Sequence, residues 1–186
     1  MRLFIAIPLG EAAEAELKRL IARLRPAAPD LRWSAPEDWH ITLQFLGTTS
    51  EEQCACLLPR LSGLNRAPIA IDFEGLGVFD RAGVFFLGVR RSPALEELQS
   101  RVVAATGFCG FEPEERPFRP HITLARSKAG DRNRALRGLL ERAGSDYRFA
   151  RFSATEFRLY ESFLSQSGSR YEVRGRFSMG EARLQD

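Results

Sequence analysis

Histidine is nearly absent from this chain of 186 residues, because only His40 and His121 occur. Protein metal sites need several histidine, cysteine or acidic ligands gathered together, and neither histidine has such a cluster near it in the sequence. We therefore expect no metal ion and no other cofactor. The chain also lacks a glycine-rich phosphate loop and the Gly-x-Ser-x-Gly turn of serine hydrolases, so nothing in it indicates either class.

Lysine is almost as rare as histidine. Lys18 and Lys128 are the only lysines among 27 basic residues, so the other 25 are arginine. The net charge of +3 and the pI near 9.0 suit an anionic ligand without requiring one. Arginine presents a planar fork of donors that matches phosphate. A general coding bias toward arginine explains the excess equally well, so only individual arginines close to a functional site are informative.

Long apolar runs and an even number of cysteines are missing as well. No stretch approaches the length of a membrane span, and the apolar opening "MRLFIAIPLG" leads directly into the charged "EAAEAELKRL". We expect a strand there and not a signal peptide, and no membrane contact. Cys54, Cys56 and Cys109 cannot all pair, and the first two point apart on a predicted helix. We therefore predict reduced thiols in a cytoplasmic protein.

Local patterns predict alternating strands and helices. An apolar strand over 3–8 is followed by leucines at helical spacing until Pro26, and Ser50 with Gln53 forms a capping box for a second helix. Ser92 followed by Pro93 predicts the start of a third helix. The segments "IAIDFEGLGVF" and "GVFFLGVRR" are predicted strands joined at "DRAG", and two more strands flank "SQSGS". A polar helix is expected around 131–142.

One stretch of sequence occurs twice, because both histidines are followed by Ile-Thr-Leu. The offset of 81 residues between the two histidines also carries Leu3 onto Val84 and Leu17 onto Leu98. Both halves are predicted to run strand, helix, histidine-bearing strand, helix, strand. We therefore predict a single α+β domain over 1–186, made of two half-repeats of roughly 1–80 and 81–186 that pack about a pseudo-twofold axis.

Successive side chains of a strand point to opposite faces, so this alternation determines which side chains of the repeated stretch share a face. In the first copy, one face carries His40, Thr42 and Gln44, and the other face carries Ile41, Leu43 and Phe45. In the second copy, His121 and Thr123 share a face. Two such strands across a cleft would bring two imidazoles and two hydroxyls to one small volume. Histidine, with an ordinary pKa of about 6.5, can supply both an acid and a base near neutral pH, and the hydroxyls can hydrogen-bond phosphate oxygens.

Paired His-x-Thr motifs in two half-repeats resemble the 2H phosphoesterase superfamily, in particular its RNA 2′,3′-cyclic phosphodiesterase branch, historically called 2′-5′ RNA ligase. The similarity runs from end to end and includes "RLFIAIPL", "WHITLQFLG", "FRPHITLAR" and "LYESFLSQSGSRY". The resemblance implies a bilobal α+β fold in which two antiparallel sheets line a central cleft, with the helices outside. It also implies metal-independent chemistry at a cyclic phosphate.

The resemblance also implies roles for individual residues. His40 would be the proton donor and His121 the proton acceptor, and the phosphate would be bound by Thr42, Thr123 and Arg126. Strict alternation would put Arg126 on the opposite face from His121, so it reaches the site only if the strand ends or bulges near Ala125. The first copy has no arginine in the corresponding region, so the two halves are not chemically equivalent.

The implied activity is hydrolysis of RNA 2′,3′-cyclic phosphate ends to 2′-phosphate ends, with 2′-5′ RNA ligation as the reverse reaction. The partner would be an RNA or oligonucleotide with a cyclic phosphate end, and we expect a monomer. Two alternatives stay open: a cyclic phosphodiesterase that acts on small nucleotides, and a non-catalytic module that binds RNA or nucleotides. Modest net charge permits the first, because a long RNA track is usually strongly basic.

Recognition of the base is harder to predict from the sequence. Three aromatic residues are candidates for stacking on a nucleobase: Phe118, Tyr160 and Phe163. Because the chain contains 14 phenylalanines, most of them are expected in the core. Alternation in "RYEVRGRF" predicts one charged strand face that carries Arg170, Glu172, Arg174 and Arg176, and such a face is more often solvated than bound to RNA.

Overall fold

The computed structural model describes residues 1–64, 67–127, 134–144, 147–165 and 168–180. Its helices are α1 (Glu11–Leu24), α2 (Glu51–Ser62), α3 (Pro93–Gly107) and α4 (Arg134–Ala143), with short 3-10 turns at Arg25–Ala27 and Pro36–Asp38. Its strands are β1 (Arg2–Pro8), β2 (Arg32–Trp33), β3 (His40–Thr48), β4 (Ile69–Ile71), β5 (Phe73–Phe79), β6 (Val84–Val89), β7 (His121–Arg126), β8 (Phe152–Ala154), β9 (Glu156–Ser165) and β10 (Gly168–Ser178). No helix within these ranges is long and apolar enough to cross a membrane.

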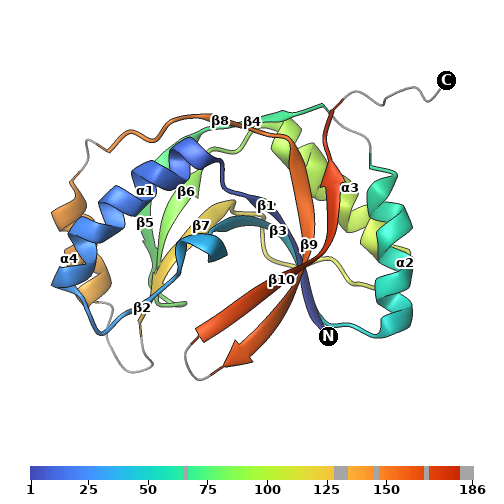
Figure 1. The fold of residues 1–186 in the computed structure, drawn as a ribbon, viewed down its shortest axis with the longest axis horizontal. Coiled ribbons are helices and arrows are strands. Elements are labelled where there is room, and N and C mark those ends of the chain that lie inside the picture. Colours follow the sequence, from blue (N-terminus) through green and yellow to red (C-terminus); the bar gives the residue numbers. More distant parts are fainter. Residues whose placement is uncertain (65–66, 128–133, 145–146, 166–167, 181–186) are drawn as a thin grey trace.

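Two four-stranded antiparallel sheets form the centre of the molecule (Figure 1). The strand order is β10-β9-β1-β3 in the first sheet and β2-β7-β6-β5 in the second, and a small β4-β8 pair is separate from both. Each sheet takes strands from both halves of the chain, since β9 pairs with β1 and β5 pairs with β6. The predicted α+β class with antiparallel sheets is confirmed.

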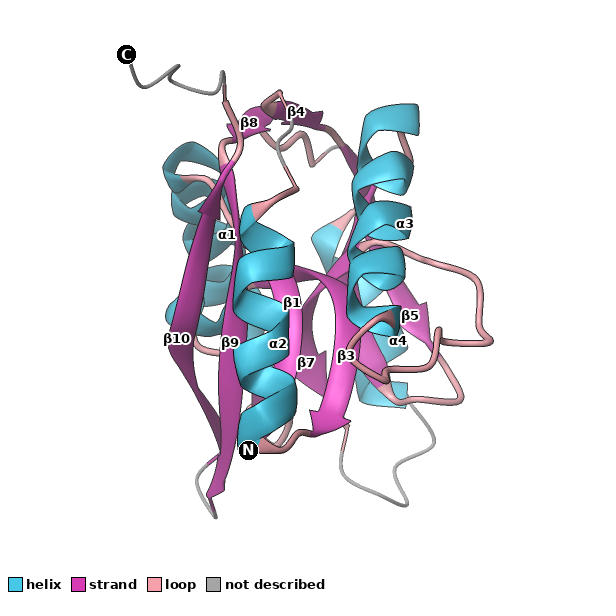
Figure 2. Cartoon of the chain, turned by 90° about the vertical axis from the view of Figure 1, so that its right-hand side faces the viewer, coloured by secondary structure: helices cyan, strands magenta, loops and turns pink. Residues whose placement is uncertain are grey.

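The helices lie outside the sheets, and α1 and α3 each pack away from the sheet that contains the strand before them. The helix α3 leaves β6 of the second sheet but packs with α2 against β3 of the first sheet, as seen from the side in Figure 2. Likewise α1 leaves β1 of the first sheet and packs with α4, which contacts β5 of the second. Because α1 packs with α4 and α3 packs with α2, each helix contacts a helix of the other half, and the two halves of the chain share one core.

One face of each sheet supplies that core. On β1 the side chains of Leu3, Ile5 and Ile7 are buried in it together with leucines of α2 and α3, while Phe4 and Ala6 point to the opposite face and form a separate small cluster with Tyr160. The second sheet repeats this pattern, with Phe85 and Leu87 buried in the main core and Phe86 between them on the other side. We call the faces of Phe4 and Phe86 the motif faces.

The predicted helix signals are confirmed at both sites where a cap was expected. The Ser50 hydroxyl accepts a hydrogen bond from the Gln53 backbone amide, and the Gln53 side chain accepts one from the Ser50 amide, which is a complete capping box. The Ser92 side chain accepts from the Leu95 amide, with Pro93 in the first helical position. The predicted start of the last helix at 131 lies outside the described residues.

The prediction of three reduced cysteines is wrong. Cys56 on α2 and Cys109, just after α3, form a disulfide with their Cα atoms 5.9 Å apart, and Cys54 is a buried free thiol. The two bonded cysteines are 53 residues apart in sequence. They meet because α3 crosses over to lie beside α2, an arrangement that cysteine spacing alone did not indicate.

Candidate functional site

The two motif histidines are the first residues of β3 and β7, and these two strands contact each other across the boundary between the sheets. His40 and His121 are both partly buried. The contact between β3 and β7 brings the two rings near each other, and a charge on His121 accordingly lowers the pKa of His40. The structure therefore brings together the two histidines that the repeat paired in sequence.

Each imidazole is held by the same backbone contact. The Nδ1 atom of His40 lies 2.6 Å from the carbonyl oxygen of Asp38, and Nδ1 of His121 lies 2.7 Å from that of Arg119, in both cases two residues earlier in the chain. A carbonyl oxygen can only accept a hydrogen bond, so Nδ1 must carry the proton in each ring. The Nε2 atom is then left to accept a proton when the ring is neutral and to donate one when it is charged.

The surroundings disfavour a positive charge on either ring. The pKa of His40 is lowered to about 4, mainly by burial and to a smaller extent by the charges of His121 and Arg126, while the carbonyl of Asp38 opposes the change. Burial also lowers the pKa of His121, again with Arg126 contributing and the Arg119 carbonyl opposing. Both imidazoles are therefore neutral at neutral pH in the ligand-free protein.

Arg126 reaches the same face as His121 because β7 contains a bulge. Thr123 is opposite Phe86 on β6, and Ala125 is opposite Phe85, so Leu124 is an extra residue in β7. Leu124 and Ala125 are both buried, and the alternation resumes with Arg126 exposed on the motif face. The influence of Arg126 on the pKa of both histidines agrees with this position.

The first motif strand has the same bulge, and here the predicted alternation is wrong. Thr42 is opposite Ala6 on β1 and Gln44 is opposite Ile5, so Leu43 is the extra residue. Gln44 is consequently buried, where its side-chain oxygen accepts a hydrogen bond from the Thr106 hydroxyl on α3 at 2.8 Å. Phe45 does not point into the core. It lies on the motif face with 62% of its surface exposed.

The bulges define which residues of the two halves are equivalent. Phe45 and Arg126 both stand five residues after a motif histidine and immediately after the bulge, so they occupy the same place in the two motif strands. Their partners are Phe4 and Val84, so Val84 corresponds to Phe4 and not to Leu3 as the constant sequence offset predicted. The pairing register, not the sequence offset, decides the correspondence in β1 and β6.

Aromatic rings surround each histidine on the motif faces. The ring of His40 lies 4.8 Å from that of Phe4 and 5.4 Å from that of Tyr171, and Tyr160 stacks on Phe4 at 5.1 Å. In the second sheet the ring of His121 lies 4.9 Å from Phe79 and 5.6 Å from Phe86. Alternation along β1 could have predicted that Phe4 lies on the opposite face from the core residues. The other aromatic contacts to the histidines depend on which strands pair.

The predicted base-stacking residues have different surroundings. Tyr160 belongs to the aromatic cluster beside His40. Phe118 packs against the main core, and Phe163 lies near the end of β9 with the Arg170 guanidinium 5.4 Å from its ring. The sequence did not single out Phe45 for this role, because strict alternation placed its ring in the core.

The charged face predicted for β10 is also wrong in part. Arg170 pairs with Glu172 and Arg174 with Glu161, but an irregularity between Val173 and Gly175 changes the alternation. Arg176 is therefore opposite Arg158 on β9, on the motif face of the first sheet, where it pairs with Glu156.

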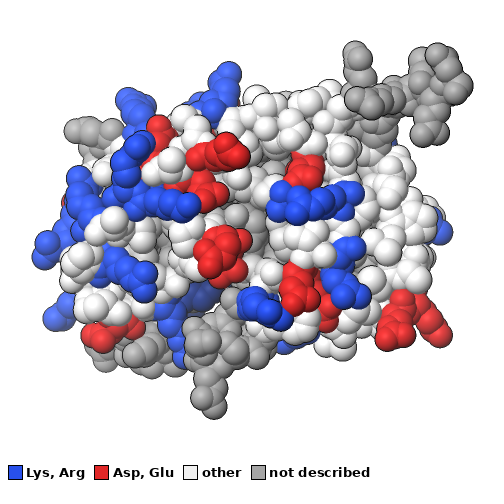
Figure 3. Space-filling model, in the orientation of Figure 1, with Lys and Arg blue, Asp and Glu red and all other residues white. Residues whose placement is uncertain are grey.

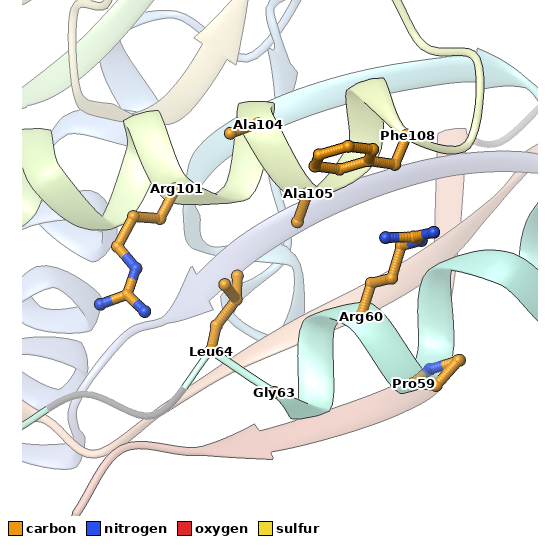
Figure 4. A pocket seen from close by; sticks show the side chains of 8 residues that line it. All are labelled: Pro59, Arg60, Gly63, Leu64, Arg101, Ala104, Ala105 and Phe108. Carbon is orange, nitrogen blue, oxygen red and sulfur yellow. The ribbon is translucent and has the colours of Figure 1, made fainter.

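A groove lies away from the motif faces, between α2 and α3 (Figure 4). Its volume is about 340 Å³, and it is lined by Pro59, Arg60, Gly63, Leu64, Arg101, Ala104, Ala105 and Phe108. Because α2 and α3 cover the core face of the first sheet, this groove is on the opposite side from His40 and Thr42. It contributes nothing to the histidine site.

Metal ligation finds no support in the residues that the structure describes. Among them no three histidine, cysteine, aspartate or glutamate side chains are grouped as a metal site would need. The two motif strands instead present two imidazoles, two threonine hydroxyls and the Arg126 guanidinium, all of which suit an anion.

Comparison with known proteins gives the family. Residues 11–162 match the family model described as the 2′-5′ RNA ligase superfamily. The chain belongs to this superfamily. A relative from Archaeoglobus fulgidus named RNA 2′,3′-cyclic phosphodiesterase is 30% identical over 175 residues, which cover 92% of this chain and 97% of the relative. One of the same name from Geobacillus stearothermophilus is 36% identical over 133 residues, but these span only 42% of its length and 69% of this chain.

Two solved structures that are similar to this chain have the same fold. Escherichia coli LigT complexed with NADP+ superposes with a TM-score of 0.77 at 27% identity, over 97% of this chain and 98% of LigT. The structure of TT0787 from Thermus thermophilus gives a TM-score of 0.78 at 28% identity, over 98% of this chain and 100% of TT0787. The fold expected from the resemblance is therefore confirmed.

Proposed function

We propose that this protein hydrolyses 2′,3′-cyclic phosphate ends of RNA to 2′-phosphate ends. The observation that carries the proposal is the matched pair of imidazoles, each fixed through Nδ1 by a backbone carbonyl, with Arg126 electrostatically coupled to both. An acid, a base and a cation are the groups that hydrolysis of a cyclic phosphodiester requires. The names of the relatives and the LigT complex with 3′-AMP support a nucleotide phosphate as the ligand.

In the proposed reaction His121 accepts a proton from water, and the resulting oxygen attacks the phosphorus of the cyclic phosphate. The bond from phosphorus to the 3′ oxygen breaks, and His40 donates a proton to that oxygen. The hydroxyls of Thr42 and Thr123 and the guanidinium of Arg126 hydrogen-bond the non-bridging oxygens as negative charge develops on them. With an RNA 5′-hydroxyl in place of water as the nucleophile, the same breakage of the bond to the 3′ oxygen forms a 2′-5′ linkage.

The lowered pKa of His40 sets a condition on this scheme. As proton donor His40 must be charged, yet burial keeps it neutral in the ligand-free site. The negative charge of a bound phosphate favours the imidazolium and raises the pKa, so substrate binding itself would supply the acid. His121 is already neutral, as the base must be.

Phe45 is the residue that we propose stacks on the terminal base. Its ring is exposed on the motif face and stands where the other half carries the phosphate-binding Arg126. Phe4 supports it from the neighbouring strand, with the ring centres 6.0 Å apart. Because every base has an aromatic face, stacking there holds the end of an RNA without selecting its sequence.

A small nucleotide is the second candidate substrate. On the face shown in Figure 3, blue basic atoms gather at the left, over α1 and α4, whereas blue and red atoms are interleaved over the rest, so no continuous basic track crosses the face. A surface of this kind does not favour a long RNA. We nevertheless propose an RNA end as the substrate of a metal-independent, monomeric enzyme. The proposed cytoplasmic location rests on the RNA substrate alone, because a disulfide such as Cys56–Cys109 is rare in that compartment.

The test is incubation of a 5′-labelled oligonucleotide ending in a 2′,3′-cyclic phosphate, with EDTA present throughout. The expected product carries a 2′-phosphate, and the His40→Ala and His121→Ala variants should lose most of the activity. Formation of only a 3′-phosphate contradicts the assignment. Binding without any change of the cyclic end identifies a non-catalytic module, and activity that returns only on addition of a divalent metal refutes metal independence.

A further inference from the structure

A second arginine lies beside Arg126 on the motif face. The short strand β2 extends the second sheet on the free side of β7, and it places Arg32 directly opposite Arg126. Residues directly opposite each other in an antiparallel pair share a face, with Cβ atoms about 5 Å apart. Arg32 therefore shares the face of His121, Thr123 and Arg126, and its side chain is exposed.

The position of Arg32 is fixed by its neighbours in the chain. The indole Nε1 of Trp33 donates a hydrogen bond to the carbonyl of Ala28 at 2.9 Å, and the ring packs edge-on against Phe85 of the core. The backbone amide of Ser34 donates to the carbonyl of Leu124 at 2.9 Å. Although β2 has only two residues, these contacts hold it against the bulge of β7.

The pairing of Arg32 with Arg126 needs an electrostatic explanation, because like charges directly opposite each other destabilise a sheet. Several other arginines meet a carboxylate, as Arg151 meets Asp72 and Arg137 meets Asp80. Within the described part of the chain, neither Arg32 nor Arg126 has a carboxylate partner. Two adjacent guanidinium groups without a counter-charge form a site for an anion.

The two arginines differ in their relation to the histidines. Arg126 lowers the pKa of both, whereas Arg32 is not among the charges that affect either ring. Since β7 lies between β2 and β6, Arg32 is on the outer side of Arg126. An anion beside Arg32 is therefore farther from the imidazoles than the group on which they would act.

We propose that Arg32 binds the phosphodiester that precedes the terminal nucleotide of the substrate. This inference rests on the proposed function and specifies its substrate class: an oligonucleotide with at least one internal phosphate, not a mononucleotide. Arg126 holds the cyclic phosphate at the histidines, and Arg32 holds the next phosphate along the strand. The single negative charge on each phosphate then compensates one of the two adjacent arginines.

The experiment compares two substrates with the same cyclic end: a dinucleotide that contains one internal phosphodiester, and the matching nucleoside 2′,3′-cyclic phosphate. For the Arg32→Gln variant we expect kcat/KM to fall about 10-fold or more on the dinucleotide, as loss of a charged hydrogen bond predicts, and to change less than about 2-fold on the mononucleotide. Arg32→Lys should recover part of the loss. Arg101→Gln, which removes an arginine from α3 beside the groove of Figure 4, is the matched control and should leave both substrates unaffected.

The salt dependence of binding gives a second measurement, which would not change if Arg32 had only a structural role. The ligand is the dinucleotide with a 2′-phosphate. The logarithm of its dissociation constant should rise with the logarithm of the salt concentration, and the slope should be about 0.7 larger for the wild type than for Arg32→Gln. Equal losses on both substrates would mean that Arg32 acts on the reacting phosphate, and no loss on either would mean that it binds none. Both results overturn the inference.

The two proposals can fail separately. If the wild type hydrolyses both substrates with equal efficiency, the cyclic phosphodiesterase stands and the role of Arg32 is refuted. If the wild type hydrolyses neither, the proposed function fails. In that case binding still tests the role of Arg32. We would measure the affinities of wild type and Arg32→Gln for the dinucleotide and mononucleotide 2′-phosphates, and a loss confined to the dinucleotide means that Arg32 binds an internal phosphate. Thermal unfolding of each variant shows whether it is folded before any of these comparisons is made.

Discussion

Phe45 and Arg126 occupy equivalent positions in the two halves of the molecule. Each stands five residues after a motif histidine, follows a bulge, and projects onto the motif face. One is an exposed aromatic ring and the other is a cation that acts on both imidazoles. The pseudo-symmetric halves thus share the His-x-Thr part and differ at the residue beside it, where we propose that Phe45 binds the base and Arg126 binds the phosphate.

Replacement of Phe45 tests the proposed stacking of its ring on the terminal base. Phe45→Ala should raise KM for a cyclic-phosphate-ended dinucleotide by about 5-fold to 150-fold, since stacking of a base on an aromatic ring contributes about 1–3 kcal/mol. Phe45→Trp should retain most of the affinity. Phe108→Ala is the matched control, because Phe108 is 74% exposed but lies on the helix side of the first sheet. Steady-state kinetics in which Phe45→Ala matches the control would disprove stacking.

Replacement of Arg126 should have two separable effects. Without its guanidinium, stabilisation of the phosphate is lost, and kcat/KM should fall about 100-fold to 1000-fold. At the same time the pKa of both histidines should rise, because the nearby cation that lowers them is gone. Titration of the two imidazoles by NMR, in wild type and in Arg126→Ala, measures the second effect without turnover. A lower histidine pKa in the variant would contradict the geometry described for β7.

The pH dependence of kcat/KM follows from the lowered pKa values. One histidine must be charged and the other neutral, and the fraction of such molecules is largest between the two pKa values of the free protein, both of which lie below 6.5. We expect a bell-shaped profile with its maximum below pH 6.5 and apparent pKa values that belong to the coupled pair. The maximum of kcat should lie at higher pH, because bound phosphate favours the imidazolium. A flat profile from about pH 5 to 9 would count against two-histidine catalysis.

The division of labour between the histidines can be tested with a substrate in which sulfur replaces the 3′ bridging oxygen. A thiolate leaves without needing a proton, so loss of the proton donor matters less on this substrate. His40→Ala should regain much of its lost rate, whereas His121→Ala should stay slow, since water still needs a base. Rescue of His121→Ala in place of His40→Ala would reverse the two roles.

The disulfide should stabilise the fold without taking part in the reaction. Cys56 and Cys109 are 53 residues apart, and closing a loop of that length in the unfolded chain predicts a contribution of about 4 kcal/mol as an upper value. Denaturant unfolding of the wild type should therefore shift to lower midpoints when a reductant is added. The double variant Cys56→Ala with Cys109→Ala should unfold at a similarly low midpoint and show no response to reductant. Equal unfolding midpoints for the oxidised and reduced wild type would show that the disulfide does not stabilise the fold.

The sequence by itself determined the parts of this protein that depend on local or repeated patterns. The capping box at Ser50 and the helix start at Ser92 are set by side-chain to backbone hydrogen bonds within four residues, so their partners are visible in the chain. The repeated Ile-Thr-Leu after His40 and His121 identified the two motif strands, because a duplication needs no knowledge of contacts. Antiparallel sheets and outer helices followed from the family resemblance.

Only the tertiary structure decided which side chains join the histidines. A bulge is a property of two paired strands, so period-two alternation in one strand could not show that Leu43 and Leu124 are extra residues. The face of Phe45, the burial of Gln44 and the exposure of Arg126 all depend on those two residues. The position of Arg32 beside Arg126 depends on the pairing of β2 with a strand about 90 residues later in the chain, and the bond between Cys56 and Cys109 depends on the crossing of α3. Contacts between distant segments are selected by the packing of the whole core, which no short stretch of sequence contains.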